Sequence, residues 1–188
     1  MPREIAERSD TIAALGEVFR KHGYSGASLA EITERTGLGK GSLYHFFPDG
    51  KQEMAEAVLE DVSRWFEAHV FTPLQDPADP MDAIEHMFEA VDAYFHSGER
   101  ICLLGAFALG DTRERFKAPI NDYFTRWTDA LTRALLRTGL TRTQARHTAE
   151  EVVVAIQGAL VIARSRQDPQ VFARTLRRLR QRIATARQ

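Results

Sequence analysis

Apolar residues recur three and four positions apart along almost the whole chain, and this periodicity constrains the fold more than any other feature. A helix presents such residues on one face, whereas a strand requires strict alternation, and no stretch alternates long enough to indicate a sheet. The chain has 188 residues, of which 44% are hydrophobic, so it can bury a sizeable core. We therefore predict an all-α protein of about nine helices.

Residues 28–46 contain the two predicted helices whose ends are most clearly marked in the sequence. Ser28 and Glu31 have the types and spacing of a capping box at the start of a helix. Gly37 ends that helix, and Gly39 permits a tight turn before a second, short helix over residues 40–46. Two short helices joined by such a turn predict a helix-turn-helix.

The remaining segments are marked by glycine, proline and the apolar period. Three prolines fall within residues 72–80, where no helix can continue. Asp111 and Glu114 predict a cap for a helix that Pro119 either kinks or restarts in its first turn. The other predicted helices cover residues 9–22, 51–70, 84–98, 101–109, 111–139, 143–166 and a segment from residue 169 onward.

The outward face of residues 40–46 carries the types that bind phosphate and base edges. Glycine inside a helix costs about 1 kcal/mol relative to alanine, so Gly41 suggests close approach of a ligand rather than helix stability. Lys51 begins the next helix, where free backbone N–H groups also attract an anion. The candidate donors on the short helix are Lys40, Ser42, Tyr44 and His45.

The string GYSGASLAEITERTGLGKGSLYHFF, followed by Lys51, resembles the DNA-binding region of the tetracycline-repressor (TetR) family of bacterial transcription regulators. The resemblance covers residues 9–66 at motif level. Gly39 stands where the family usually has serine or threonine, and the longer turn PDG is similar to that of multidrug-responsive members. The resemblance implies phosphate contacts from Ser28, Tyr44, His45 and Lys51, and major-groove contacts from Lys40, Gly41 and Ser42.

The resemblance also implies two domains and a function. Residues 1–50 are expected to form the DNA-binding domain and residues 51–188 a ligand-binding and dimerisation domain, with helix 51–70 connecting them. We expect a homodimeric repressor, not an enzyme, that a small hydrophobic effector releases from a palindromic operator. The alternative is an all-helical small-molecule carrier or enzyme that uses its first helices only as a docking module.

Aromatic side chains concentrate in the middle of the chain. A largely apolar pocket with a few polar anchors suits a small hydrophobic or aromatic effector, although such stripes also build ordinary cores. The predicted pocket residues are Trp65, Phe66, His69, Phe88, Asp92, Phe95, Phe107, Tyr123 and Trp127.

The last two predicted helices carry a stripe of modest apolar side chains. The resemblance implies that they build a four-helix interface between subunits, and the alternative is an internal core face. The predicted interface residues are Val152, Ala155, Ile156, Ala159, Ala163, Phe172, Leu176 and Leu179.

The cysteine count, the charged start and the absence of ligand motifs bear on disulfide, metal, membrane and cofactor sites. The lone Cys102 cannot form an intrachain disulfide or a thiolate zinc site, so it is either a buried small residue or a redox sensor. The charged start and the short apolar runs favour a cytoplasmic protein without a membrane span. No metal-ligand or cofactor motif is found, so we expect no metal and no cofactor.

The net charge of -1 means that any DNA site is local. Residues 1–50 contain six Lys and Arg against seven Asp and Glu, so binding is expected to depend on a few aimed donors. Arginines dominate the chain from Arg164 to Arg187. They form either a solvated face that pairs with acids such as Glu150 and Glu151, or a second DNA site.

Overall fold

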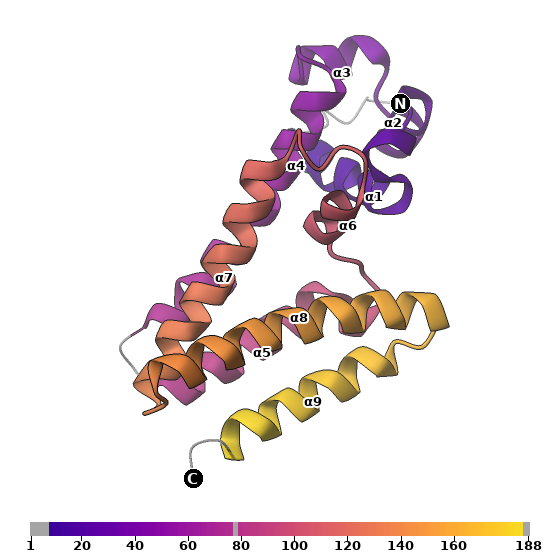
Figure 1. The fold of residues 1–188 in the computed structure, drawn as a ribbon. Helices are drawn as coiled ribbons and strands as arrows, with labels where there is room; N and C mark the ends of the chain where they lie inside the picture. Colours follow the sequence, from indigo (N-terminus) through magenta and orange to yellow (C-terminus); the bar gives the residue numbers. More distant parts are fainter. Residues whose placement is uncertain (1–7, 77–78, 186–188) are drawn as a thin grey trace. The chain divides into compact units, whose positions relative to one another are not determined.

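The computed structural model describes residues 8–76 and 79–185, and within these ranges the chain forms nine α-helices and no strand (Figure 1). The predicted all-α fold is therefore confirmed. Pro77, Arg187 and the first seven residues of the predicted N-terminal domain lie outside the described residues.

The first three helices are α1 (Arg8–Gly26), α2 (Leu29–Thr36) and α3 (Lys40–Phe46). Gly23 interrupts α1 with a φ of 66°, so the regular helix ends at the predicted position. Gly37 closes α2 in the left-handed conformation, with a φ of 68°. Side chains from all three helices and from the segment after them meet in one core, which includes Leu15, Phe19, Ile32, Leu43, Phe47 and Met54.

Helix α4 (Lys51–Phe66) ends earlier than predicted. The chain continues as a π-helical turn (Glu67–Phe71) and a 3₁₀ turn (Pro73–Gln75), so residues 51–70 are helical but change their hydrogen-bond pattern near the end. The proline that begins the 3₁₀ turn prevents further α-helix, as expected.

Helices α5 (Pro80–Tyr94) and α6 (Leu103–Leu109) correspond to the fifth and sixth predicted helices, but α5 ends before the predicted Gly98 and a 3₁₀ turn (His96–Gly98) follows it. The prediction that Asp111 and Glu114 cap the next helix is wrong, because residues 110–116 form turns and α7 (Lys117–Arg137) begins later. Pro119 lies in the first turn of α7, where its fixed φ is compatible with the helix.

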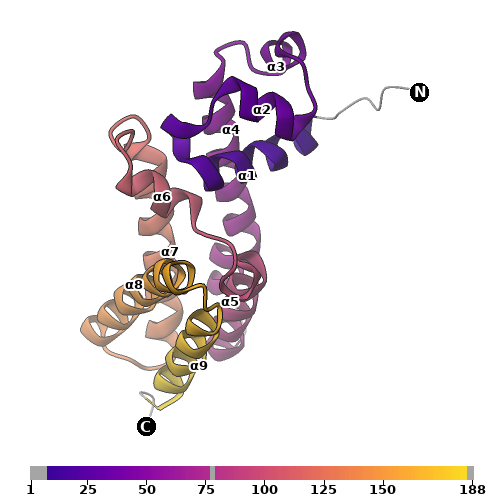
Figure 2. The ribbon, with the colours of Figure 1, turned by 90° about the vertical axis from the view of Figure 1, so that its right-hand side faces the viewer.

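Helices α8 (Arg142–Arg166) and α9 (Gln170–Thr185) lie side by side, as Figure 2 shows. Thr141 caps α8 in a capping box with Gln144, so the helix begins just before the predicted residue 143. Gln167, in the left-handed conformation, ends α8 and allows the chain to turn into α9.

The described residues form two compact units. The first contains the chain up to Ser63 together with Leu103–Ile120, and the second contains Arg64–Cys102 and the chain from Asn121 onward. The segment 103–120 thus joins α1–α4 in the first unit, although it lies far from them in sequence. The predicted functional division at residue 50 stays a prediction.

Candidate nucleic-acid interface

Helix α3 buries one side and exposes the other. Leu43 is fully buried, whereas the five predicted contact residues on this helix are exposed, and Tyr44 leaves 45% of its area in solvent. The structure therefore brings together Lys40, Gly41, Ser42, Tyr44 and His45 on one exposed surface, which we call the α3 face.

The glycines of α3 leave this face open. A Cβ atom built at Gly39 or Gly41 meets no atom within 4 Å, so packing within the described chain does not require glycine at either position. Gly39 occupies the N-cap without a side-chain hydrogen bond. Backbone at Gly41 can consequently approach a partner more closely than any residue with a side chain would allow.

The turn before α4 positions Tyr44. Gly50 has a φ of 70°, a conformation that residues with a side chain rarely adopt, and a Cβ there would lie 3.3 Å from Cε1 of Tyr44. The tyrosine ring thus rests on this glycine and is directed by it, which favours a defined position for the phenolic hydroxyl.

Lys51 and Ser28 lie at the same corner of the first unit. Lys51 Nζ donates a hydrogen bond to the Ala27 carbonyl oxygen at 3.1 Å and lies 4.7 Å from the centroid of the Tyr24 ring. Ser28 directly follows Ala27, so the two predicted phosphate ligands converge at the start of α2. An ammonium has three N–H donors, so Lys51 retains donors for a phosphate.

The capping box at this corner is present as predicted. The Ser28 hydroxyl oxygen accepts from the backbone N–H of Glu31 at 3.2 Å, and the Ser28 N–H donates to the Glu31 carboxylate at 2.8 Å. The pKa of Glu31 is lowered, first by the Ser28 N–H and hydroxyl and then by nearby His22 and Lys21. Ser28 is exposed at this corner, so its hydroxyl lies where an anion can approach it.

Two residues of this unit carry contacts that the sequence did not indicate. Tyr24 lies in the motif that resembles the TetR family, but the sequence assigns it no contact. Arg115, from the α6–α7 turn, donates to its hydroxyl at 3.3 Å.

A cavity of about 570 Å³ lies beside α1 and α2 and is lined by acidic, basic and apolar side chains. His22 is one of them, and its ring nitrogen lies 3.1 Å from a Glu31 oxygen.

Most of the predicted pocket residues belong to the second unit. Phe66 lies at the centre of an aromatic cluster, with ring centroids 4.8 Å from Tyr123 and 5.3 Å from Trp127. His69 is exposed and stacks on Trp65 at 4.4 Å. Phe107 instead lies in the first unit. Phe88 and Phe95 are buried in the second unit, and Asp92 accepts a hydrogen bond from Ser97.

Two polar groups are buried in this aromatic cluster. The indole N–H of Trp127 has no hydrogen-bond partner among the described residues. Burial, with smaller contributions from Cys102 and Tyr94, raises the pKa of the Tyr123 phenol well above its usual range, so the hydroxyl stays protonated. Cys102 is itself buried, and its role as a redox sensor stays a prediction.

The stripe assigned to a dimer interface is covered within one chain. Seven of its eight residues are buried and Ala155 is half-buried, as the internal-core alternative requires. A different set of apolar residues on α8 is exposed, with Val154 69%, Val161 59% and Ile162 49% accessible. We call these three residues the α8 patch.

Some C-terminal arginines pair within the chain. Arg182 forms an ion pair with Glu151. Arg180 lies 3.0 Å from Glu85, and Arg174 lies 3.0 Å from Asp168.

In the described part of the chain, no helix is long and apolar enough to cross a membrane, and no cluster of side chains suits a metal ion.

A capped helix, a glycine-containing turn and a short helix with a buried anchor and an exposed polar face define a helix-turn-helix DNA-binding protein. Two family models match the chain. The model described as "Bacterial regulatory proteins, tetR family" matches residues 12–58, and "Transcriptional regulator LmrA/YxaF-like, C-terminal domain" matches residues 80–178. The chain belongs to the TetR family of DNA-binding transcriptional regulators.

Individual relatives agree with this membership. The HTH-type transcriptional regulator YxaF of Bacillus subtilis is 24% identical over 165 residues, which cover 86% of each chain. The HTH-type transcriptional repressor KstR2 of Mycolicibacterium smegmatis is 28% identical over 126 residues, 61% of each chain. A solved structure of a CifR cysteine mutant with 26-bp double-strand operator DNA is 22% identical, with a TM-score of 0.73 over 96% of this chain and 98% of that one.

Proposed function

We propose that the protein is a homodimeric repressor that binds a palindromic operator and is released by a small hydrophobic or aromatic effector. The α3 face carries this proposal, since a buried Leu43 anchors a helix whose remaining exposed residues include a cation, two hydroxyls, an imidazole and a bare backbone at Gly41. Lys40, Gly41 and Ser42 face the bases, whereas Tyr44, His45, Lys51 and Ser28 hold phosphates.

The short length of α3 supports the proposal of a dimer. One seven-residue helix reads only a few base pairs, so specificity requires two copies about 34–36 Å apart on the duplex, or a multiple of that distance. The α8 patch offers an exposed apolar surface for the second copy. The repressor name of KstR2 and the operator complex of CifR support this proposal by relationship.

The aromatic cluster of the second unit is the proposed effector site. Its rings supply apolar surface, and the Trp127 N–H, unpaired among the described residues, supplies a donor for an acceptor on the effector. Helix α4 runs from Lys51 to Phe66, so it contains both a phosphate ligand and a residue of this cluster. Effector binding is proposed to reorient α4 and to change the separation of the two α3 helices.

Selection of bound duplexes from a random-sequence pool, followed by titration, tests this function. A coupling of about 1–3 kcal/mol between effector and DNA gives about a 5- to 150-fold loss of operator affinity, and operator DNA must weaken effector binding by the same factor. Unequal factors contradict the scheme, and a protein without preference for any duplex supports the carrier or enzyme alternative.

Variants of the α3 face separate the two kinds of contact. Tyr44→Phe removes one phosphate donor, so it is expected to weaken binding to all sequences alike. Lys40→Ala is expected to reduce the preference for the selected site as well, because it removes a base contact. Equal behaviour of both variants across sequences contradicts the assignment of Lys40.

A further inference from the structure

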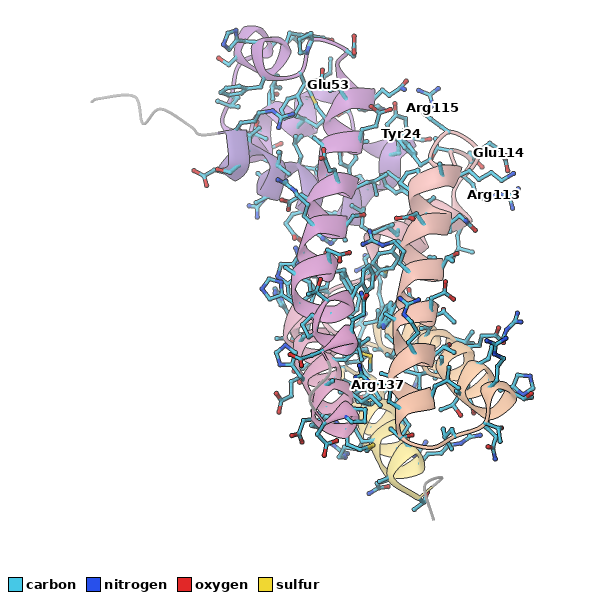
Figure 3. All side chains as sticks on the ribbon, turned by 90° about the vertical axis from the view of Figure 1, so that its left-hand side faces the viewer. Tyr24, Glu53, Arg113, Glu114, Arg115 and Arg137 are labelled. Atoms are coloured by element: carbon cyan, nitrogen blue, oxygen red, sulfur yellow. The ribbon has the colours of Figure 1, made fainter. Side chains whose placement is uncertain are left out.

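A cationic side chain outside the recognition helix connects the α6–α7 turn to the start of α4. Arg115 Nη1 donates to the Tyr24 hydroxyl at 3.3 Å and to Gln52 Oε1 at 3.2 Å. Its guanidinium also lies 5.5 Å from the centroid of the Tyr24 ring. All three residues belong to the first unit, and Figure 3 labels Arg115 and Tyr24.

Tyr24 is shared between two cations. Lys51 Nζ lies 4.7 Å from the centroid of the same ring, within the range of a cation–π contact. The ring is held from other directions by Phe19, Phe107 and Phe116, with centroids at 6.1, 6.2 and 5.2 Å. The tyrosine is therefore a fixed platform against which Lys51 rests.

Gln52 is the second acceptor of the same Arg115 nitrogen, Nη1. The Gln52 amide nitrogen donates to Glu56 at 3.0 Å, so its oxygen is left to accept from Arg115. While Nη1 donates to both acceptors, the guanidinium carbon lies 5.5 Å from the centroid of the Tyr24 ring. A planar guanidinium can donate and stack on an aromatic face at once, whereas a lysine ammonium is a compact point charge on a flexible stem. The arrangement thus depends on an arginine rather than on positive charge alone.

We propose that Arg115 is a positioning residue for DNA binding, which holds Tyr24 and Gln52 so that the Lys51 ammonium stays aimed at a phosphate beside Ser28. This inference rests on the proposed phosphate contact of Lys51. The segment 103–120 continues at both ends into the second unit along the chain.

The same turn provides a matched control. Arg113 lies two residues earlier, and its guanidinium is paired with the neighbouring Glu114 at 2.6 Å. Figure 3 shows Arg113 and Glu114 on the outer side of the turn, away from Tyr24. Arg113→Ala thus removes the same charge from the same turn and leaves the Tyr24 contacts in place.

A double-mutant cycle on a duplex selected from the random pool tests the positioning role. Arg115→Ala is expected to weaken binding about fivefold, the scale of one exposed cation–π contact, and Arg115→Lys is expected to restore little. Lys51→Ala is expected to reduce the slope of log affinity against log salt by about 0.9, the contribution of one phosphate. Adding Arg115→Ala to Lys51→Ala is expected to change neither affinity nor slope further.

Lysine NMR gives a readout that does not depend on DNA. The chain has four lysines, at positions 21, 40, 51 and 117, so ¹³C-dimethylation gives four assignable side-chain signals. The Tyr24 ring current is expected to shift the Lys51 signal upfield of the others. In Arg115→Ala this signal is expected to move toward the other lysines, and in Arg113→Ala it is expected to stay.

The outcomes separate the inference from the function on which it rests. Additive losses in the double mutant, with a second reduction of the slope, overturn the inference because Arg115 then contacts a phosphate itself. An unchanged Lys51 signal in Arg115→Ala, or an equal loss of binding in Arg113→Ala, also overturns it. If Lys51→Ala binds like the wild type, the proposed phosphate contact fails, and the inference fails with it.

Discussion

At the scale of single residues, Gly41 is a glycine that packing within the described chain does not require, and the proposed close approach of DNA gives it a role. No atom lies within 4 Å of a Cβ built there, so alanine fits the described chain without strain. Gly41→Ala is expected to raise the free energy of unfolding by up to about 1 kcal/mol, because alanine favours helix. It is expected to weaken DNA binding about tenfold or more, equal to at least about 1.4 kcal/mol, because the methyl group occupies space that the DNA backbone or a base must enter.

Chemical denaturation and a binding titration of the same variant check both effects. Gly26→Ala serves as the control, since Gly26 is exposed at the end of α1 and its Cβ would only touch His22 at ordinary distance. Unchanged DNA affinity in Gly41→Ala contradicts close approach at this position.

Single residues also mark the limit of inference from sequence. The α3 face could be predicted because its residues share one helix and its register follows from the buried Leu43. The contact between Arg115 and Tyr24 could not be predicted, because it joins residues 91 positions apart that no local pattern relates. Likewise, the predicted interface stripe has the composition of a core, and only the packing of α8 against α9 shows that one chain already covers it.

At the scale of elements, Ser28 combines the cap of α2 with a proposed phosphate contact. Ser28→Ala is expected to lower the free energy of unfolding by about 1 kcal/mol, because the cap is lost, and to weaken DNA binding. Ser28→Asp keeps a good cap, so stability is expected to be retained, but its charge repels a phosphate. Thermal unfolding and DNA titration of both variants distinguish the roles, and full DNA affinity in Ser28→Asp excludes a phosphate at this site.

The capping box also predicts how α2 responds to acid. The pKa of Glu31 is lowered in the folded protein, chiefly by the Ser28 N–H. A lowered carboxyl pKa stabilises the fold above the unfolded-state pKa, and this contribution is lost as pH falls through the folded-state pKa. Glu31→Gln keeps an amide that can cap, so its stability is expected to fall less than that of the wild type between about pH 5 and pH 3. Parallel melting curves at several pH values check this, and identical acid profiles contradict it.

The predicted helix ends agree with the structure where a local sequence signal marks them. The capping box of Ser28 and the left-handed Gly37 fix α2 from side-chain and backbone chemistry alone. The end of α4 was misplaced because a π turn keeps the apolar pattern while changing its hydrogen bonds. The start of α7 was misplaced because Asp111 has the type of a capping residue but lies in a turn.

At the scale of the whole molecule, the two units show that domains are not simple stretches of sequence. The segment 103–120 joins the first unit through contacts such as those of Phe107 with Phe19 and Tyr24. Its neighbours on both sides in the chain belong to the second unit. Periodicity predicted the helices of both units, but it cannot assign a helix to a unit because that assignment depends on long-range contacts.

The α8 patch leads to a prediction about assembly. Val161→Glu is expected to produce a monomer, because a buried unpaired charge costs several kcal/mol, and to abolish tight binding to the selected operator. Sedimentation equilibrium and DNA titration check the two effects. Leu109→Glu is the control, since Leu109 is 84% exposed on α6 and its change adds the same charge elsewhere. A dimeric Val161→Glu protein places the interface on another surface.

The most direct measurement is the number of chains on the selected duplex, obtained by native mass spectrometry together with the affinity for each isolated half-site. Two α3 helices reading one palindrome predict two chains per duplex, a two-fold-symmetric selected sequence, and much weaker binding to a half-site alone. One chain per duplex, with equal affinity for the half-site and the full site, would contradict a dimeric regulator.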